Sequence, residues 1–320
     1  MTGSELAAWG RRSVAGFAEH QVAAGLLPPS EAAELARSVF AHELPDGRAT
    51  AGQHLWTVRD ASAVSGEAVG HLWLRVRPGA DEAVEAYVMD VDVEEPWRGR
   101  GIATAVLRAG QDAARRLGAG VLRLQVFTHN LPAVRLYDRL GYQVVASTMT
   151  KLLDGTPPGR SPVDVQLRDM TQDEYAASRV HLEAGYVAGL VAAGAVSPEE
   201  TAGRAGRDLD RMLLDGPATS GHRLWTAYDG PGATGRPVGH AWVALRHRSD
   251  GVHAFGYDLQ VRPELRRAGT GRGLVLAAEE ELRRLGVRSA ELSVSDAGAQ
   301  AFYERLGFEV TAQTRAKALR

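Results

Sequence analysis

Residues 98–103, Arg98-Gly99-Arg100-Gly101-Ile102-Ala103, lie between a strand pattern and a helix pattern. Before them, residues 86–93 alternate as a β-strand does, and after them residues 102–117 carry apolar side chains at helical spacing. The two glycines allow a tight turn and a close approach of the backbone to a ligand. The first amides of the helix have no hydrogen-bond partner within it, and the helix dipole adds a partial positive charge at this end. The stretch therefore predicts a cradle for a pyrophosphate group.

Two other kinds of phosphate-binding loop do not fit this pattern. A P-loop ends in Gly-Lys-Ser/Thr, and no such ending follows Gly101 or Gly269. A dinucleotide fingerprint requires G-x-G-x-x-G, but Gly269 and Gly271 are followed by Gly273, one position too early. The cradle is therefore neither of these loops.

The chain also repeats itself. Adding 169 takes residues 69–73 (VGHLW) onto residues 238–242 (VGHAW), and adding 166 takes residues 137–141 (YDRLG) onto residues 303–307 (YERLG). Chance does not keep one register for so long, so we infer a duplicated domain.

Each copy predicts an α/β domain, with helices packed on one mixed sheet. In the first copy we expect helical segments over residues 5–39, broken at Pro28-Pro29, and over 102–117 and 132–140, with strands over 55–59, 68–76, 86–93, 121–127 and 142–151. Strict alternation places two sets of side chains on opposite faces of the third strand. One set is Val88, Asp90 and Asp92; the other is Tyr87, Met89, Val91 and Val93.

The expected boundaries are residues 1–151 for the first domain, 152–162 for a linker and 163–320 for the second domain. The linker is rich in glycine and proline and has no apolar period. Residues 163–168 alternate like a strand, whereas the first copy has no counterpart, because Met1 aligns with Met170. Three explanations stay open: the first sheet lacks this edge, another segment or chain supplies it, or the start codon has been assigned too late.

The loop and its surroundings resemble the GNAT acetyltransferase superfamily. Residues 98–103 and 266–271 both fit that family's Arg/Gln-x-x-Gly-x-Gly/Ala loop, and residues 130–142 resemble its coenzyme-facing helix. The resemblance implies two tandem domains, each with a mixed, mostly antiparallel sheet flanked by helices. It also implies acetyl-CoA as the co-substrate, with pantetheine lying where the strand ending at residue 93 parts from its neighbour.

The same resemblance implies which residues bind the coenzyme. In the first copy they are Val91, Val93, Arg98, Gly99, Arg100, Gly101, Ile102, Ala103 and Asn130. In the second copy they are Val261, Arg266, Arg267, Ala268, Gly269, Thr270 and Gly271. A helix N-cap is the alternative interpretation of Asn130.

Transfer of an acetyl group to an amine needs a base, an oxyanion donor and an acid. An alkylammonium has a pKa of about 10.4, so a base must take a proton near neutral pH. Asp90 and Asp92 are the candidates, with Asp92 preferred, although a structural role is the alternative for each. The resemblance implies backbone amides around residues 91–93 as the oxyanion donors and Tyr137 as the general acid. A core position is the alternative for this tyrosine.

The two copies differ at these positions. The second copy keeps Tyr303 for Tyr137 but has Gln260 in place of Asp92 and Arg267 in place of Gly99. The place of Asn130 falls on Asp296 or Gly298, depending on where a gap is put. We therefore expect both copies to bind coenzyme and the first copy to be the catalyst.

Composition limits the remaining classes of function. The 320 residues carry a formal net charge of −2, which gives no reason to expect a nucleic-acid partner. The absence of cysteine excludes disulfides and thiolate sites and fits a reducing cytoplasm. No run approaches the roughly 18 apolar residues of a membrane span. No metal site is expected, because no cluster has ligand spacing, and His71 and His240 are interpreted as packing or acceptor-pocket residues.

The sequence thus predicts an N-acetyltransferase that moves an acetyl group from acetyl-CoA to a primary amine of a small molecule. A protein or peptide N-acetyltransferase and a non-catalytic acyl-CoA-binding protein are the alternatives. The identity of the acceptor, the acyl-chain preference and the oligomeric state stay open, with a homodimer among the alternatives for the last.

Overall fold

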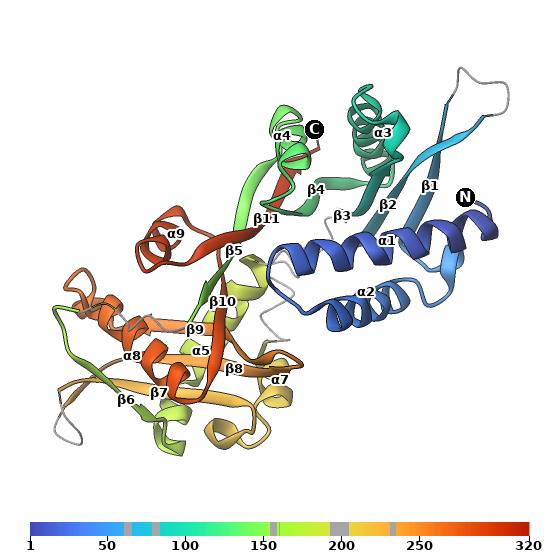
Figure 1. The fold of residues 1–320 in the computed structure, drawn as a ribbon. Helices are drawn as coiled ribbons and strands as arrows, with labels where there is room; N and C mark the ends of the chain where they lie inside the picture. Colours follow the sequence, from blue (N-terminus) through green and yellow to red (C-terminus); the bar gives the residue numbers. More distant parts are fainter. Residues whose placement is uncertain are drawn as a thin grey trace. The chain divides into compact units, whose positions relative to one another are not determined.

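The computed structural model describes residues 1–60, 66–78, 84–153, 159, 161–192, 205–230 and 235–319. They form two compact units (Figure 1). Unit 1 contains Met1–Val145 together with Ala312–Arg320, and unit 2 contains Ala146–Thr311. Most of the expected linker, residues 154–158 and 160, lies outside the described residues.

Unit 1 begins with two helices, α1 (Gly3–Ala23) and α2 (Pro29–Glu43). Thr2 and Glu5 form a capping box at the start of α1, in which each backbone amide donates to the other residue's side chain. Gly25 follows the end of α1 with a φ of 68°, a conformation that glycine adopts without strain. Pro29 occupies the first position of α2, where an amide would have no helical partner. The predicted break at Pro28-Pro29 is confirmed.

The sheet of unit 1 has the order β1-β2-β3-β4-β11. Its strands are β1 (Gln53–Arg59), β2 (Ala68–Pro78), β3 (Val84–Val93), β4 (Ala119–Phe127) and β11 (Glu309–Ala318). β3 and β4 are parallel, because α3 (Ile102–Arg116) crosses over between them, and the other pairs are antiparallel. A helix α4 (Leu131–Arg139) follows β4, and single 3₁₀ turns occur at Gly47–Ala49 and Glu95–Trp97.

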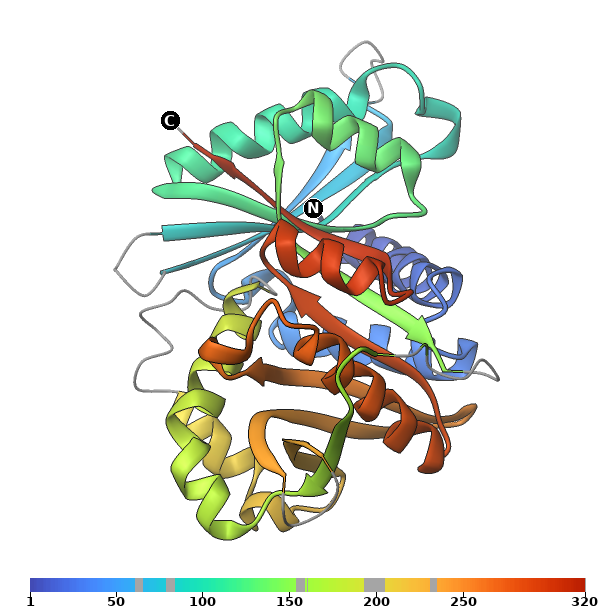
Figure 2. The same ribbon diagram turned by 90° about the vertical axis from the view of Figure 1, so that its left-hand side faces the viewer.

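Helices cover both faces of this sheet. Leu72 and Leu74 of β2 pack with Val106 and Leu107 of α3. Trp73 lies between them in sequence and therefore points to the opposite face, where it packs with Trp9 of α1. Figure 2 shows α3 and α1 on opposite sides of the strands of unit 1. The fold class predicted from the sequence is confirmed.

Unit 2 has the sheet order β5-β10-β9-β8-β7-β6. Its strands are β5 (Gln143–Leu152), β6 (Val165–Asp169), β7 (His222–Asp229), β8 (Arg236–Arg248), β9 (Gly251–Val261) and β10 (Val287–Val294). The helices of its described residues are α5 (Gln172–Ala192), α7 (Ala205–Met212), α8 (Thr270–Arg284) and α9 (Ala297–Glu304), with 3₁₀ turns at Gly216–Ala218 and Pro263–Leu265. Only β9 and β10 are parallel among the pairs of this order.

The last strand of each repeat lies in the sheet of the other unit. β5, which ends the first repeat, pairs with β10, and its Met149 is fully buried in the core of unit 2. β11, which ends the second repeat, pairs with β4, and Leu319 beyond it joins the core of unit 1. The compact units therefore differ from the expected division at residues 151 and 163. Sequence similarity follows the repeats, whereas compactness follows the exchanged strands.

Buried charges accompany this exchange in unit 2. Lys151 Nζ on β5 lies 2.6 Å from Glu279 Oε1 on α8 and also donates to the Leu306 carbonyl (2.6 Å). The Glu279 side chain is only 2% exposed and also accepts from Arg283 (3.2 Å). Two cations thus neutralise a carboxylate that would otherwise be costly to bury.

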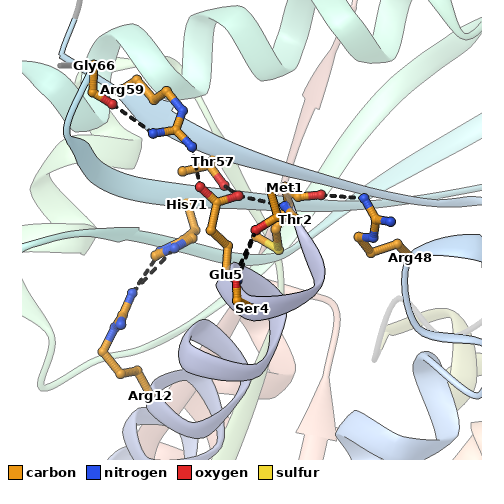
Figure 3. Close-up of polar contacts among 10 residues, drawn as sticks. All are labelled: Met1, Thr2, Ser4, Glu5, Arg12, Arg48, Thr57, Arg59, Gly66 and His71. Atoms are coloured by element: carbon orange, nitrogen blue, oxygen red, sulfur yellow. Dashed lines mark hydrogen bonds and ion pairs between the residues drawn. The ribbon is translucent and has the colours of Figure 1, made fainter.

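The edge strand predicted at residues 163–168 is present as β6, which pairs with β7. Among the described residues of unit 1, nothing pairs with the outer edge of β1, so β1 is the edge of that sheet. In unit 2 a cation on the edge strand, Arg168, donates to the capping-box carboxylate of Glu174 (2.9 Å). In unit 1 the corresponding carboxylate of Glu5 is met by Arg59 from β1 itself (Figure 3). Arg59 thus replaces the charge that the edge strand supplies in unit 2.

Candidate functional site

In each unit one parallel pair of strands separates toward its carboxyl ends. β3 and β4 pair only as far as Val88 and Leu124, although β3 continues to Val93. β9 and β10 pair as far as Gly256 and Leu292 and then part in the same way. Strands that stop pairing leave backbone amides and carbonyls without a ladder partner. The separation lies where the sequence predicts that pantetheine binds.

A β-bulge lies at the point of separation and changes which side chains share a face. In unit 1 the register against β2 shifts between Trp73 and Leu74, so that Met89 of β3 is the extra residue. Met89 packs with Trp9 on the α1 side, and Asp90 hydrogen-bonds to Trp9 on that same side, whereas Val88 and Val91 both contact the core under α3. The predicted strict alternation over residues 86–93 is therefore wrong from Met89 onward.

Asp90 and Asp92 nevertheless share a face, as the sequence predicts. Asp92 is paired across the ladder with His71, and His71 contacts Arg12 of α1. Trp9 Nε1 donates to Asp90 Oδ2 (2.9 Å), and Ser13 also bonds this carboxylate. Burial raises the pKa of Asp90 against these hydrogen bonds. Asp90 is thus held by helix α1, on the side of the sheet away from α3.

The loop at residues 98–103 has the geometry expected of an anion cradle. Gly99 and Gly101 have φ values of 77° and 81°, which only glycine adopts without strain. Gly101 is the N-cap of α3, and no side chain caps the helix there. A β-carbon built on either glycine would meet no atom within 4 Å, so the backbone faces open space. The uncapped amides fit a pyrophosphate group.

The two arginines of this loop do not both point toward such a ligand. Arg98 Nε donates to the Val93 carbonyl (2.8 Å), and its guanidinium lies 3.4 Å from Asp92. Arg100 lies over the ring of Trp97, 4.8 Å from its centroid. Arg98 therefore braces the end of β3 against the start of the loop.

The loop of unit 2 keeps the same backbone path with different residues. Gly269, the N-cap of α8, has a φ of 90°, and Arg266 Nε donates to the Val261 carbonyl (3.1 Å) as Arg98 does to Val93. Arg267, at the place of Gly99, has a φ of 65°. A non-glycine residue in this conformation costs about 1–2 kcal/mol, so the fold retains the turn at the expense of strain.

The tyrosines of the predicted coenzyme-facing helices are embedded in each core. Tyr137 on α4 is buried, with its ring 5.7 Å from that of Tyr142, and burial raises its pKa. Tyr303 on α9 is half-buried, and burial and then the charge of Asp258 raise its pKa. Asn130 accepts from the Ala133 amide (3.2 Å) as the N-cap of α4, the alternative left open by the sequence. Asp296 caps α9 in the same way and occupies the place of Asn130 in the second copy.

Unit 2 contains a cavity of about 400 Å³ at the separation of β9 and β10. Its lining comes from α5, β8, β9, α8, β10 and α9, and includes Asp258, Gln260, Glu291, Ser293, Asp296 and Tyr303. The cavity thus reaches both the α5 side and the α9 side of the sheet. It places the counterpart of Asp90 and the counterpart of Tyr137 around one space.

Sequence reasoning missed the pairing of His240 with Asp258. His240 Nε2 lies 2.7 Å from Asp258 Oδ2, and the Asp258 side chain is only 7% exposed. In unit 1 the corresponding His71 instead contacts Arg12 (3.3 Å), and burial lowers its pKa. The recurring histidine beside a recurring aspartate was visible in the repeat, but their contact depends on the packing around two adjacent strands.

Two further findings concern the described part of the chain. None of its helices is long and apolar enough to cross a membrane. Within the same residues, no three side chains of His, Cys, Asp or Glu gather in a way that could hold a metal ion.

Comparisons with known proteins bear on the family and the fold. Residues 26–142 match the model of the acetyltransferase (GNAT) family, and residues 220–310 match an acetyltransferase (GNAT) domain model. The uncharacterized N-acetyltransferase YycN of Bacillus subtilis is 37% identical over 43% of this chain and 85% of its own length. A mycothiol acetyltransferase of Pseudarthrobacter chlorophenolicus is 29% identical over 71% of this chain and 68% of its own. A GCN5-related N-acetyltransferase structure from Sphaerobacter thermophilus shares the fold, with a TM-score of 0.57, 22% identity and coverage of 96% and 92%.

Proposed function

The chain belongs to the GNAT acetyltransferase family, and we propose that it transfers the acetyl group of acetyl-CoA to a primary amine of a small molecule by direct attack. The observation that carries this proposal is the separation of the parallel strands β3 and β4. The strand β3 is followed by a glycine-rich loop and the uncapped start of α3, and β4 is followed by α4, which carries Tyr137. The similarity to a mycothiol acetyltransferase supports a small-molecule acceptor over a peptide.

The proposed coenzyme contacts follow from the loop geometry. The amides at the start of α3 bind the pyrophosphate, and the pantetheine arm lies where β3 and β4 separate, beside Val91 and Val93. The loop at residues 266–271 does the same in unit 2. Arg98 and Arg266 contribute by holding the strand end rather than by pairing with phosphate.

The proposed chemistry uses a carboxylate and a tyrosine. The carboxylate takes a proton from the ammonium group, the amine nitrogen bonds to the acetyl carbon, and the carbon–sulfur bond breaks. Backbone amides at the strand end stabilise the oxyanion. The tyrosine hydroxyl protonates the departing thiolate, and the second proton that the nitrogen loses on becoming an amide restores the hydroxyl. Asp90 or Asp92 with Tyr137 are the candidates in unit 1, and Tyr303 is the candidate acid in unit 2.

Calorimetric titration with acetyl-CoA, followed by release of free thiol in the presence of amines, tests this function. We expect one or two coenzyme molecules per chain and thiol release that requires an amine. Tyr137→Phe and Tyr303→Phe should bind acetyl-CoA normally, and the one in the working unit should lose transfer. No binding at millimolar acetyl-CoA would refute the proposal, and binding without transfer to any amine would leave a coenzyme-binding protein.

A further inference from the structure

The cavity of unit 2 brings two chemically different groups to the same space from opposite sides of the sheet. Asp258 lies on the side of α5, where Gly185 approaches it. Tyr303 projects from α9 on the side of the core under α8. The pairing of β9 with β10 has ended at Gly256, so the sheet does not separate the two groups. This arrangement suits a reaction that removes a proton on one side and returns one on the other.

We infer that acetyl transfer takes place in this cavity of unit 2, where Asp258, positioned by His240, takes the proton from a cationic amine. The inference rests on the acetyl transfer proposed above and assigns it to the second repeat. It reverses the expectation from the sequence that the first repeat is the catalyst.

The surroundings of Asp258 fix its carboxylate, which lines the cavity although the side chain is only 7% exposed. His240 Nε2 holds one oxygen at 2.7 Å. Gln260 Nε2 lies 3.4 Å from the other oxygen and 3.2 Å from the His181 carbonyl. Gln260 stands where the first copy has Asp92, and from the sequence this difference counts against catalysis by the second copy. In the structure it replaces a second carboxylate with a hydrogen-bond donor.

The corresponding carboxylate in unit 1 has different neighbours. Asp90 accepts from Trp9 and Ser13 of α1, while burial, and to a lesser degree the nearby Asp92 charge, raises its pKa. Gly185 of α5, whose position corresponds to Gly16 of α1, leaves room for Asp258 because it has no side chain. The same residue type therefore accepts a hydrogen bond from a tryptophan in one unit and lines a cavity in the other.

The charges around the cavity favour a cationic acceptor. The described residues that line it include the carboxylates of Asp258, Glu291, Asp296 and Glu279, and none of those residues is a lysine, arginine or histidine. Lys151 and Arg283 neutralise Glu279, while Arg246 is 4.0 Å from Glu291. Burial also raises the pKa of Glu291, on which Arg248 acts as well. The carboxylates of Asp258 and Asp296 are then the ones that stabilise a bound ammonium group and disfavour a carboxylate-bearing acceptor.

The step balances within the cavity. The ammonium proton passes to Asp258, the freed amine nitrogen bonds to the acetyl carbon, and the thiolate leaves with the electron pair of the carbon–sulfur bond. Tyr303 gives its proton to the thiolate, and the second proton that the nitrogen loses on becoming an amide restores the Tyr303 hydroxyl. The proton on Asp258 is finally lost to solvent. His240 acts as a positioning residue, because it touches Asp258 and is not among the residues that line the cavity.

The test compares Asp258→Asn and His240→Asn with His253→Asn. His253 is another buried histidine of unit 2, bonded to Asp250 (2.9 Å) and Ser289 (2.7 Å) and absent from the cavity lining. Thermal unfolding of each variant shows whether it folds, and acetyl-CoA titration shows whether the coenzyme site is intact. Thiol release is measured with 1,4-diaminobutane, butylamine and 4-aminobutanoate, which place a second ammonium, a methyl or a carboxylate on similar chains.

We expect Asp258→Asn to lower kcat by about 10²- to 10⁴-fold while acetyl-CoA binding is retained. Its deficit should shrink as the pH rises toward the pKa of the amine, because neutral amine then no longer needs a base. His240→Asn should lower kcat and alter the pH profile of kcat without changing the KM for acetyl-CoA. His253→Asn should leave both kcat and its pH profile as in the wild type. The diamine should exceed 4-aminobutanoate in kcat/KM by at least about tenfold.

The failure of this inference differs from the failure of the proposed function. Active Asp258→Asn protein, or a preference for 4-aminobutanoate, overturns the inference and leaves acetyl transfer intact. Wild-type protein that neither binds acetyl-CoA nor acetylates an amine overturns the proposed function itself. If Asp258→Asn or His240→Asn does not fold, Tyr303→Phe is tested instead. It should lose acetyl transfer by the same reasoning, and full activity of this variant would overturn the inference.

Discussion

The substitution Gly185→Ala gives a direct test of how α5 places Asp258. A β-carbon at residue 185 would lie 2.3 Å from Asp258 Oδ1 and 2.4 Å from its Cγ, far inside van der Waals contact. The carboxylate must therefore move by about 1 Å, or the helix must shift, to restore normal contact distances. The matched control is Gly16→Ala in α1, one repeat earlier, where the added carbon would meet nothing within 4 Å.

The expected magnitudes separate stability from activity. An alanine in a helix gains about 1 kcal/mol over glycine, whereas overpacking a filled site costs about 1–3 kcal/mol. Gly185→Ala should therefore change the free energy of unfolding by no more than about 2 kcal/mol. A displacement of about 1 Å at a reacting group can cost about 10²-fold in rate, so kcat should fall by that order while acetyl-CoA affinity stays constant.

The assay is thiol release at saturating acetyl-CoA, with urea unfolding measured in parallel. Gly16→Ala should be equal or more stable by up to about 1 kcal/mol and should retain the wild-type kcat. A Gly185→Ala protein with wild-type kcat would refute the placement of Asp258 in the reacting geometry. Equal loss in Gly16→Ala would show that the effect belongs to helix substitution in general.

Three further predictions follow from the described contacts. Burial opposes ionisation of Glu174, but hydrogen bonds from Thr171, Tyr228 and Arg168 lower its pKa from 4.5 to about 2. The ionised Glu174 carboxylate therefore contributes its full stabilisation above pH 4.5 and loses it as the pH falls toward 2. Over that pH range, the free energies of unfolding of the wild type and of Glu174→Gln should converge. Gly101→Val should weaken acetyl-CoA binding in calorimetry, because a β-branched side chain at a φ of 81° costs at least about 1–2 kcal/mol. Gly120→Val, the control at a position without positive φ, should bind acetyl-CoA as the wild type does. Lys151→Met should lower the free energy of unfolding, measured in urea, by about 1–3 kcal/mol, because Glu279 then keeps only its ion pair with Arg283. The double variant Lys151→Met/Glu279→Met should recover most of this loss. No loss in the single variant would contradict the role of the pair.

Local patterns in the sequence predicted most of the elements. The turn at Gly99 and Gly101 needs positive φ, and the helix after it has a strong apolar stripe, so the loop and α3 could be placed from neighbouring residues alone. The break at Pro28-Pro29 and the edge strand at residues 163–168 are likewise consequences of local conformation. The repeat then predicted a second unit with the same elements.

The sequence could not predict the face of residues beyond Met89. A bulge adds one residue without leaving a mark in a run of apolar and acidic side chains, and one extra residue reverses the alternation that follows. The exchange of β5 and β11 is also invisible locally, because two similar strands fit two similar sheets.

The sequence by itself determined the duplicated α/β fold, the two glycine loops and the tyrosine helices, because each depends on conformational preferences within a few residues. Only the tertiary structure decided that Asp258 meets His240 and a cavity while Asp90 meets Trp9. The two aspartates occupy equivalent positions on equivalent strands. Their environments differ because residues far away in the sequence, on α1 and α5, pack against them with a tryptophan in one unit and a glycine in the other.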